Sequence, residues 1–164
     1  MNSENICMTD NEMELVFDAL SINESLARVA VASFITAKNP TLEELSDIKT
    51  AVSEAVTNAI IHGYENDGRN VKKQGDSQKV RLHCSFRGKL LVIEVEDRGV
   101  GIANVEQAME PLFTTKPDKD RSGMGFSFME AFMDELEVES TPGEGTIIRM
   151  QKEIGYTPWI SEED

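Results

Sequence analysis

The stretch from Thr41 to Gly63, TLEELSDIKTAVSEAVTNAIIHG, predicts one long amphipathic helix. Thr41 followed by Glu44 is a capping-box pattern, in which the first turn of a helix satisfies its own free amides. Gly63 is suited to the left-handed residue that closes many helices. The apolar residues recur at helical spacing and form a stripe that we expect to be buried, consisting of Leu45, Ile48, Val52, Val56, Ala59 and Ile60.

A strand and a further helix are predicted before this stretch. Residues Glu12 to Asp18 alternate between apolar and polar side chains, which is typical of a half-buried strand. Ser21 followed by Glu24 is a second capping-box pattern, and Asn39-Pro40 ends the helix that it opens. The apolar residues that this helix carries are Ile22, Leu26, Val29, Ala30 and Phe34.

Strands joined by short turns dominate the rest of the chain. The polar segment from Glu65 to Gln78 is typical of a flexible loop, and Pro111 to Ser122 form a lid-like connection. The expected elements are strands over 80–86 and 90–96, a short helix over 104–109, a helix over 124–134 and a hairpin that pairs 136–140 with 146–152. The sequence therefore predicts an α+β two-layer sandwich, with a mixed or antiparallel sheet and helices on one face.

Length and composition indicate one cytoplasmic domain. The 164 residues suffice for a single core, which we place at residues 12–152, between a flexible N-terminus over 1–11 and an acidic tail over 153–164. No apolar run approaches the roughly 20 residues that span a bilayer, and the polar N-terminus is unlike a secretory signal. Cys7 and Cys84 make neither a metal-ligand spacing nor a disulfide framework, as expected in a reducing cytoplasm.

The net charge of −14 bears on the partners. A surface this acidic repels a phosphate backbone, which argues against direct binding of nucleic acid. It favours association with a basic protein, although many acidic surfaces serve only solubility. The charge therefore disfavours one class of ligand without naming a partner.

Glu54 and Asn58 lie one turn apart in the long helix, about 40° from each other around its axis. They lie away from the apolar stripe, so one face presents a carboxylate and an amide to the same space. An amide oxygen is a suitable neutral ligand for Mg²⁺ that already binds triphosphate oxygens and water. A carboxylate one turn earlier can accept a proton from an attacking hydroxyl. Taken alone, the pair is also compatible with a solvated polar face.

The segment Asp97-Arg98-Gly99-Val100-Gly101 directly follows a predicted strand. A carboxylate at a strand end accepts a hydrogen bond from the exocyclic amine of adenine, and it repels the carbonyl oxygen that guanine has in that place. Gly99 and Gly101 allow the backbone to approach a flat ligand closely, and they permit positive φ. Taken alone, an acidic residue before glycines is also a common tight turn.

A third segment, Arg121-Ser122-Gly123-Met124-Gly125-Phe126, precedes a predicted helix. Small residues at a helix start leave amides free for phosphate oxygens, which the helix dipole also favours. Lys116 and Arg121 add the positive charge that triphosphate binding requires in so acidic a chain, together with Mg²⁺. Taken alone, the segment is also an ordinary helix start that contains glycine.

The order of these segments resembles the GHKL ATPase superfamily, in which an N box and two glycine boxes build the ATP site. Residues 54–63 resemble the N box, 97–101 the first glycine box and 123–125 the second. More narrowly, the chain resembles the family of sporulation anti-sigma F factors from about Glu12 to Lys152. The segments that carry this narrower resemblance are 23–29, 53–64, 111–117 and 121–126.

The resemblance implies a dimeric serine/threonine kinase with two protein partners. Members of the family hold sigma F away from RNA polymerase when ATP is bound, and they phosphorylate a serine of the anti-anti-sigma factor. By position, Glu54 would be the general base and Asn58 the Mg²⁺ ligand. Asp97 would bind adenine, and Arg28 would contact protein partners. The implied nucleotide pocket also includes Gly99, Gly101, Thr115, Lys116, Arg121, Ser122, Gly123, Met124, Gly125, Phe126 and Thr146.

Three alternatives stay open. A stress-response anti-sigma kinase would share the chemistry and bind another sigma factor. A histidine kinase ATPase domain would follow a dimerisation helix that bears the phosphoacceptor histidine, whereas a short strand precedes the first helix here. A pure binding module would use ATP to fix its lid and would transfer no phosphate. The loop over 65–78, longer than usual for the family, bears on partner contacts rather than on chemistry.

Overall fold

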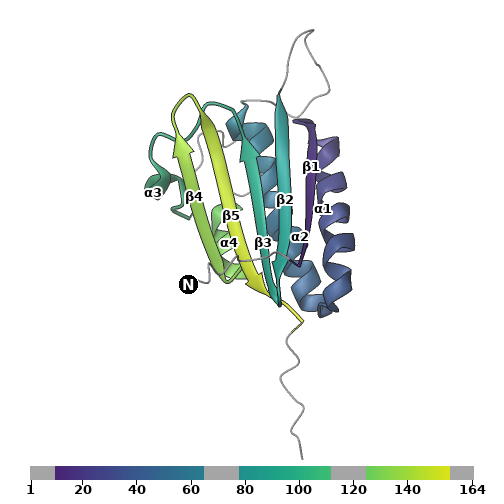
Figure 1. Cartoon of the computed structure of the whole chain (residues 1–164). Coiled ribbons are helices and arrows are strands. Elements are labelled where there is room, and N and C mark those ends of the chain that lie inside the picture. Colours follow the sequence, from purple (N-terminus) through teal and green to yellow (C-terminus); the bar gives the residue numbers. More distant parts are fainter. Residues whose placement is uncertain (1–9, 65–77, 112–124, 156–164) are drawn as a thin grey trace, which may run out of the picture.

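Five antiparallel strands form one sheet in the computed structural model, which describes residues 10–64, 78–111 and 125–155 (Figure 1). The strands in these ranges are β1 (Asn11–Asp18), β2 (Lys79–Arg87), β3 (Leu90–Asp97), β4 (Glu135–Thr141) and β5 (Gly145–Glu153). They lie in the order β1-β2-β3-β5-β4, and each neighbouring pair is antiparallel. The pairing of β3 with β5 places Asp97 opposite Thr146.

Helices α1 (Ile22–Ile35), α2 (Leu42–Asn58) and α4 (Gly125–Phe132) lie on one face of this sheet, as Figure 1 shows. A 3-10 turn over Thr36–Lys38 follows α1, and a π turn over Ala59–Gly63 extends α2. The short α3 (Val105–Ala108) follows Asn104, whose side chain accepts a hydrogen bond from the amide of Gln107. The described residues therefore confirm the predicted two-layer α+β sandwich, and the sheet is wholly antiparallel.

The core lies between the sheet and the helices. The predicted stripe of α2 is buried at Ile48, Val52, Val56, Ala59 and Ile60 and half-buried at Leu45. It packs on strand residues that alternate toward the helices because successive side chains of a strand face opposite sides. Helix α2 contacts α1 along one flank and α4 along the other. One helix thus contributes side chains to two separate surfaces.

Helix α1 differs from the prediction at its start and in the face that it buries. The capping box at Ser21 is wrong, because Ser21 already has helical backbone angles (φ −56°, ψ −30°) and makes no side-chain cap. Glu24 instead accepts a hydrogen bond from the hydroxyl of Ser53 on α2. The helix buries Ala27, Val31 and Ile35, whereas Ile22, Leu26 and Val29 are 68%, 51% and 65% exposed.

The capping box at the start of α2 is confirmed. The amide of Glu44 donates to Thr41 Oγ1 at 3.1 Å, and the amide of Thr41 donates to Glu44 Oε2 at 2.8 Å. The left-handed conformation predicted for Gly63 is wrong, since this residue is not among the glycines with positive φ. A Cβ at Gly63 would lie 2.6 Å from Cγ of Asp97. Close approach of Asp97, and not backbone handedness, therefore requires this glycine.

The described chain is packed slightly beyond the predicted domain limits. Strand β1 begins at Asn11, and Ile154, which follows β5, is fully buried. The amide of Gly155 donates to Glu44 Oε2 at 3.3 Å. Most of the predicted loop over 65–78, the lid over 111–122 and both terminal segments lie outside the described ranges. None of the helices in the described ranges combines the length and the apolar composition that a membrane span requires.

Candidate active site

The start of α4 packs against the polar face of α2. A Cβ at Gly125 would lie 3.1 Å from Glu54 Oε2 and 3.4 Å from Oδ1 and Nδ2 of Asn58. The missing side chain at Gly125 therefore lets the start of α4 approach the carboxylate and the amide closely. The structure brings together these three residues, which lie far apart in the sequence and were each singled out there.

Asp97 ends β3 and is buried, with 6% of its surface exposed. The amide of Gly99 donates to its Oδ1 at 2.9 Å. Burial raises the pKa of this carboxyl to about 6; the charge of Glu96 adds to the rise, and the backbone amides of Gly99 and Thr146 oppose it. A carboxylate held out of water in this way favours a ligand that donates hydrogen bonds to it.

Backbone hydrogen bonds hold the turn over residues 97–102 on two sides. On the side of α2, the amide of Val100 donates to the carbonyl of Gly63 at 2.8 Å. On the side of the β4–β5 hairpin, the amide of Gly143 donates to the carbonyl of Val100 at 2.7 Å. The position of Asp97 is thus set jointly by the end of α2 and by the hairpin.

The two glycines of this turn fit the backbone of the protein itself. A Cβ at Gly99 would lie 1.7 Å from the carbonyl oxygen of Gly63. Gly101 has φ of +71°, and a Cβ there would lie 2.3 Å from the carbonyl oxygen of Thr141. Positive φ was expected as an option at both glycines and is found only at Gly101. Contacts within the protein therefore explain why both positions are glycine, independently of any ligand.

Thr146 lies beside Asp97 because the two residues are partners in the β3–β5 register. It is buried, and its Oγ1 lies 2.8 Å from Ser140 Oγ. Ser140 also accepts a hydrogen bond from the amide of Ile102 at 2.7 Å. Ser140 therefore joins the hairpin to the turn that carries Asp97. The sequence alone does not indicate Ser140 as a site residue, because a serine in a strand carries no local signal.

Tyr64 is a second residue that the sequence analysis did not single out for the site. Its hydroxyl accepts a hydrogen bond from the amide of Arg98 at 2.8 Å and donates to the carbonyl of Lys79 at 2.5 Å. Burial raises the pKa of Tyr64, so the hydroxyl stays protonated. The two partners lie 34 and 15 positions away in the chain, so only the fold reveals the contact.

We expect Tyr64→Phe to weaken the binding of an adenine nucleotide at Asp97 about fivefold, which corresponds to about 1 kcal/mol. The ring stays in place, whereas the amide of Arg98 loses its acceptor and the turn becomes less ordered. Titration calorimetry with ADP measures the affinity, and a GTP titration measures whether base selectivity falls with it. Unchanged ADP affinity and selectivity would show that the hydroxyl does not position the turn.

The predicted site residues within the described ranges form two groups along α2 and its π turn. One group contains Glu54, Asn58 and Gly125, and Phe126 follows Gly125 in α4. The other contains Asp97, Gly99, Gly101 and Thr146. Asn58 and Gly63 are separated by about 7 Å along the helix axis, and Gly63 contacts Asp97. The two groups therefore border one another.

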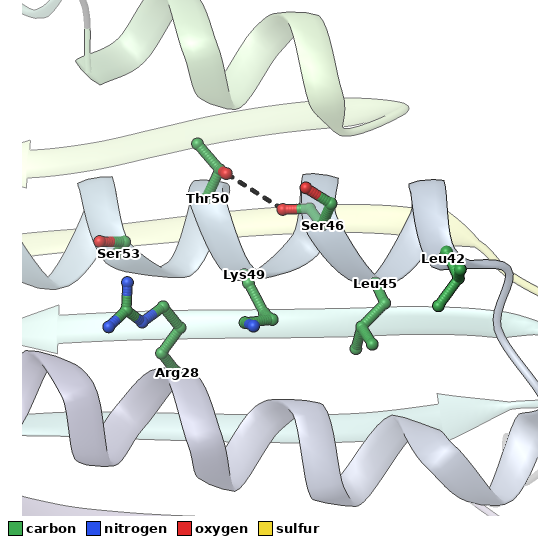
Figure 2. A pocket seen from close by; sticks show the side chains of 7 residues that line it. All are labelled: Arg28, Leu42, Leu45, Ser46, Lys49, Thr50 and Ser53. Carbon is green, nitrogen blue, oxygen red and sulfur yellow. Dashed lines mark hydrogen bonds between the residues drawn. The ribbon is translucent and has the colours of Figure 1, made fainter.

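The other predicted site residues are placed differently. Thr115, Lys116, Arg121, Ser122, Gly123 and Met124 lie outside the described ranges. Arg28 belongs to neither group and lines a groove on the opposite flank of α2 (Figure 2). Among the described residues, no three His, Cys, Asp or Glu side chains cluster as a metal site would require. The amide oxygen of Asn58 suits a metal that is also bound by phosphate and water.

Comparison with known proteins places the chain in a family. Residues 17–152 match the family described as the histidine kinase-like ATPase domain. The anti-sigma F factor of Clostridium acetobutylicum is 56% identical over 147 residues, which cover 90% of this chain and 96% of the relative. The anti-sigma F factor of Clostridium kluyveri is 53% identical over 145 residues, which cover 88% of this chain and 96% of the relative.

Two solved structures share the fold at low identity. The structure of the RsbU and RsbW domains of Rv1364c from Mycobacterium tuberculosis matches with a TM-score of 0.60 and 16% identity, over 88% of this chain and 32% of that longer chain. The catalytic domain of the histidine kinase ThkA matches with a TM-score of 0.50 and 16% identity, over 87% of this chain and 96% of that chain. Since the family match spans most of the sequence and the relatives are more than half identical along it, the chain belongs to the anti-sigma F factor family of histidine kinase-like ATPase domains.

Proposed function

We propose that this protein is a cytoplasmic, ATP-dependent serine/threonine kinase and anti-sigma factor. It binds and inhibits sporulation sigma F, and it phosphorylates a serine of the anti-anti-sigma factor. The observation that carries the proposal is the identity of 53% and 56% to proteins named anti-sigma F factor, along 96% of their length. The geometry of the site supports the chemical steps one by one.

Adenine binding is assigned to Asp97. Its buried carboxylate accepts a hydrogen bond from the exocyclic amine of adenine, whereas the carbonyl oxygen of guanine would face a negative charge. The amide of Gly99 donates a hydrogen bond to Oδ1 of Asp97 and so orients the carboxylate before the ligand binds. Thr146 is the partner of Asp97 in the β3–β5 register, and Gly101 lies against the backbone of Thr141. The site therefore selects ATP over GTP.

The residues around Glu54 fit a magnesium-bound triphosphate. The amide oxygen of Asn58 is a neutral, hard ligand, and Gly125 at the start of α4 lies beside it. When bound, Mg²⁺ neutralises phosphate charge and aligns the triphosphate for transfer. We assign the phosphates to the segment before and into α4, namely Thr115, Lys116, Arg121, Ser122, Gly123, Met124, Gly125 and Phe126.

Glu54 is assigned as the general base. It lies one turn before Asn58 on the same helix face, and its Oε2 faces the start of α4. Phosphoryl transfer requires mainly alignment and charge neutralisation. The carboxylate therefore orients the serine hydroxyl and takes its proton, while the serine oxygen bonds to the γ-phosphorus and the bond to ADP breaks.

The protein is further proposed to act as a homodimer joined along β1 and α1. Strand β1 is at the edge of the described sheet. Val16 on this strand is exposed, and so are Ile22, Leu26 and Val29 on α1. Exposed apolar side chains next to an unpaired strand edge are typical of a surface that a second copy covers.

Sedimentation equilibrium is expected to give twice the chain mass of 18.2 kDa for the wild type. Leu26→Glu places a charge in the proposed interface and is expected to give the monomer mass. The side chain is already half exposed, so the substitution leaves the core intact. A wild type that stays monomeric at tens of micromolar would contradict the dimer.

The direct test of the function is incubation with labelled ATP, Mg²⁺ and the cognate anti-anti-sigma protein. We expect label on that protein in an acid-stable form, because phosphoserine survives acid and phosphohistidine does not. An acid-labile product would favour a histidine kinase. ATP-dependent partner binding without any transfer would favour a binding module. Pull-down with ATP then separates sigma F from a stress-response sigma factor.

A further inference from the structure

Three polar side chains form a row across one end of the sheet. Asp97 of β3 pairs with Thr146 of β5, and Thr146 pairs in turn with Ser140 of β4. Asp97 and Thr146 continue the buried alternation of their strands, so both point to the face that the helices cover. Residues directly opposite each other on neighbouring strands share a face of the sheet. Ser140 is therefore the outer member of a row that ends at the carboxylate of Asp97.

The hydroxyl of Ser140 makes three hydrogen bonds. Its Oγ accepts from the amide of Ile102 at 2.7 Å, donates to the carbonyl of Gly145 at 3.0 Å, and lies 2.8 Å from Oγ1 of Thr146. A serine hydroxyl has one proton to donate and two lone pairs that accept. An amide only donates and a carbonyl only accepts, so the second lone pair takes the proton of the Thr146 hydroxyl. The hydrogen-bonding capacity of Ser140 is then fully used.

Each of these three partners borders Asp97. Ile102 closes the turn over 97–102 that begins at Asp97. Gly145 has φ of +112°, and a Cβ there would lie 2.1 Å from the carbonyl oxygen of Asp97. The backbone amide of Thr146 donates to the Asp97 carboxylate. Ser140 thus joins the end of the turn, the hairpin backbone and the neighbouring strand, which together set where the carboxylate lies.

We propose that Ser140 is a positioning residue for adenine recognition. Its hydroxyl keeps the turn, the hairpin and the hydroxyl of Thr146 in the arrangement in which Asp97 meets the exocyclic amine of the base. The inference rests on the proposed function in that Asp97 binds adenine. Ser140 acts on the base and not on the phosphates, because Glu54 and Asn58 belong to the other group of site residues.

Removal of the hydroxyl is expected to weaken nucleotide binding. Ser140→Ala leaves the amide of Ile102 without this acceptor and the hydroxyl of Thr146 free to rotate. We expect it to bind ADP about tenfold more weakly, because the turn must then be ordered when the nucleotide binds. Ser140→Thr retains a hydroxyl and suits a strand, so its ADP affinity is expected to stay within about twofold of the wild type.

Titration calorimetry with ADP measures these affinities, and Ser85→Ala is the matched control. Ser85 is also a strand serine of the same sheet, and it is buried in β2. Its partner in β3 is Val92, five residues before Asp97, so it lies about 17 Å from the row along the strand direction. Ser85→Ala therefore makes the same chemical change far from the site and is expected to bind ADP like the wild type.

Steady-state transfer to the anti-anti-sigma protein separates positioning from a loss of folded protein. Ser140→Ala is expected to raise the KM for ATP about tenfold and to keep kcat within about twofold of the wild type, since the residues that act on the phosphates are unchanged. A purely structural defect would reduce the amount of folded enzyme, which lowers kcat at an unchanged KM. A lowered kcat with the wild-type KM would therefore overturn the positioning role.

The ADP titrations give two further outcomes that would contradict the proposal. One is equal ADP affinity of Ser140→Ala and Ser85→Ala. The other is equal weakening by Ser140→Ala and Ser140→Thr, since the hydroxyl would then not be the group that matters. A wild type that binds ADP but transfers no phosphate would overturn the kinase function alone, and the ADP affinities would still decide the role of Ser140. A wild type that binds no ADP would overturn both.

Discussion

Replacing Glu54 by glutamine is expected to lower the rate of phosphoryl transfer about 10²–10⁴-fold and to leave ATP affinity nearly unchanged. Glutamine keeps the size of the side chain but takes no proton from a serine hydroxyl near neutral pH. The match in size matters because Oε2 of Glu54 lies close to Gly125 at the start of α4. A smaller residue would add a packing change to the chemical one.

Single-turnover transfer to the anti-anti-sigma protein measures the rate, and nucleotide titration measures binding. Asn58→Ala is the complementary variant, expected to lose the Mg²⁺-dependent part of ATP binding while Glu54 is retained. Transfer at the wild-type rate by Glu54→Gln would exclude the carboxylate as the base. Loss of ATP binding by the same variant would make Glu54 a binding residue instead.

The second large effect is expected at Asp97. Asp97→Asn should weaken binding of adenine nucleotides about 100-fold, since it removes a charge-assisted hydrogen bond and turns an amide NH₂ toward the adenine amine. The asparagine oxygen can still accept the hydrogen bond from the amide of Gly99, so the turn keeps its shape. The variant therefore separates ligand recognition from folding.

The raised pKa of Asp97 predicts that this variant is at least as stable as the wild type. The pKa of Asp97 in the folded protein is about 6, above the ordinary value of 3.8. Its contribution to the free energy of unfolding is therefore fully present below pH 3.8, where the carboxyl is protonated. This contribution is lost as the pH rises through about 6, and the loss amounts to roughly 3 kcal/mol. Asp97→Asn removes that loss because its side chain never ionises.

Urea denaturation without nucleotide, at pH 4.5 and at pH 7.5, measures the effect. The free energy of unfolding of Asp97→Asn minus that of the wild type should be larger at pH 7.5 than at pH 4.5. Adenine nucleotide affinity of the wild type should fall below pH 6, because a protonated carboxyl offers the adenine amine a weaker acceptor. A variant that is less stable than wild type at pH 7.5, or an affinity that does not change with pH, would contradict a buried, ionised Asp97.

Local sequence patterns predicted the elements well and their contacts less well. The stripe of α2 and its cap at Thr41 follow from spacing within a few residues, and both are present. Helix α1 shows the limit. It carries apolar residues on two sides, and periodicity does not tell which side meets the sheet; the smaller Ala27 and Val31 are buried, while the larger Leu26 faces out.

The glycines show the same limit at the candidate site. Gly63 was expected for its handedness, yet it is needed because Asp97 packs against it. Gly99 was expected for approach to a ligand, yet the carbonyl of Gly63 already occupies the space of its Cβ. Both explanations depend on which segments lie side by side in the fold, and the sequence around a glycine does not show which residues contact it.

The sequence by itself determined that Glu54 and Asn58 share one helix face, because the helical repeat is set by hydrogen bonds between residues four apart. It also determined that Asp97 follows a strand and precedes two glycines. Only the tertiary structure decided that Gly125 lies against Glu54 and that Tyr64 and Ser140 hold the turn of Asp97. These contacts depend on strand order and on how helices pack across the sheet, which are settled by burial summed over the whole core.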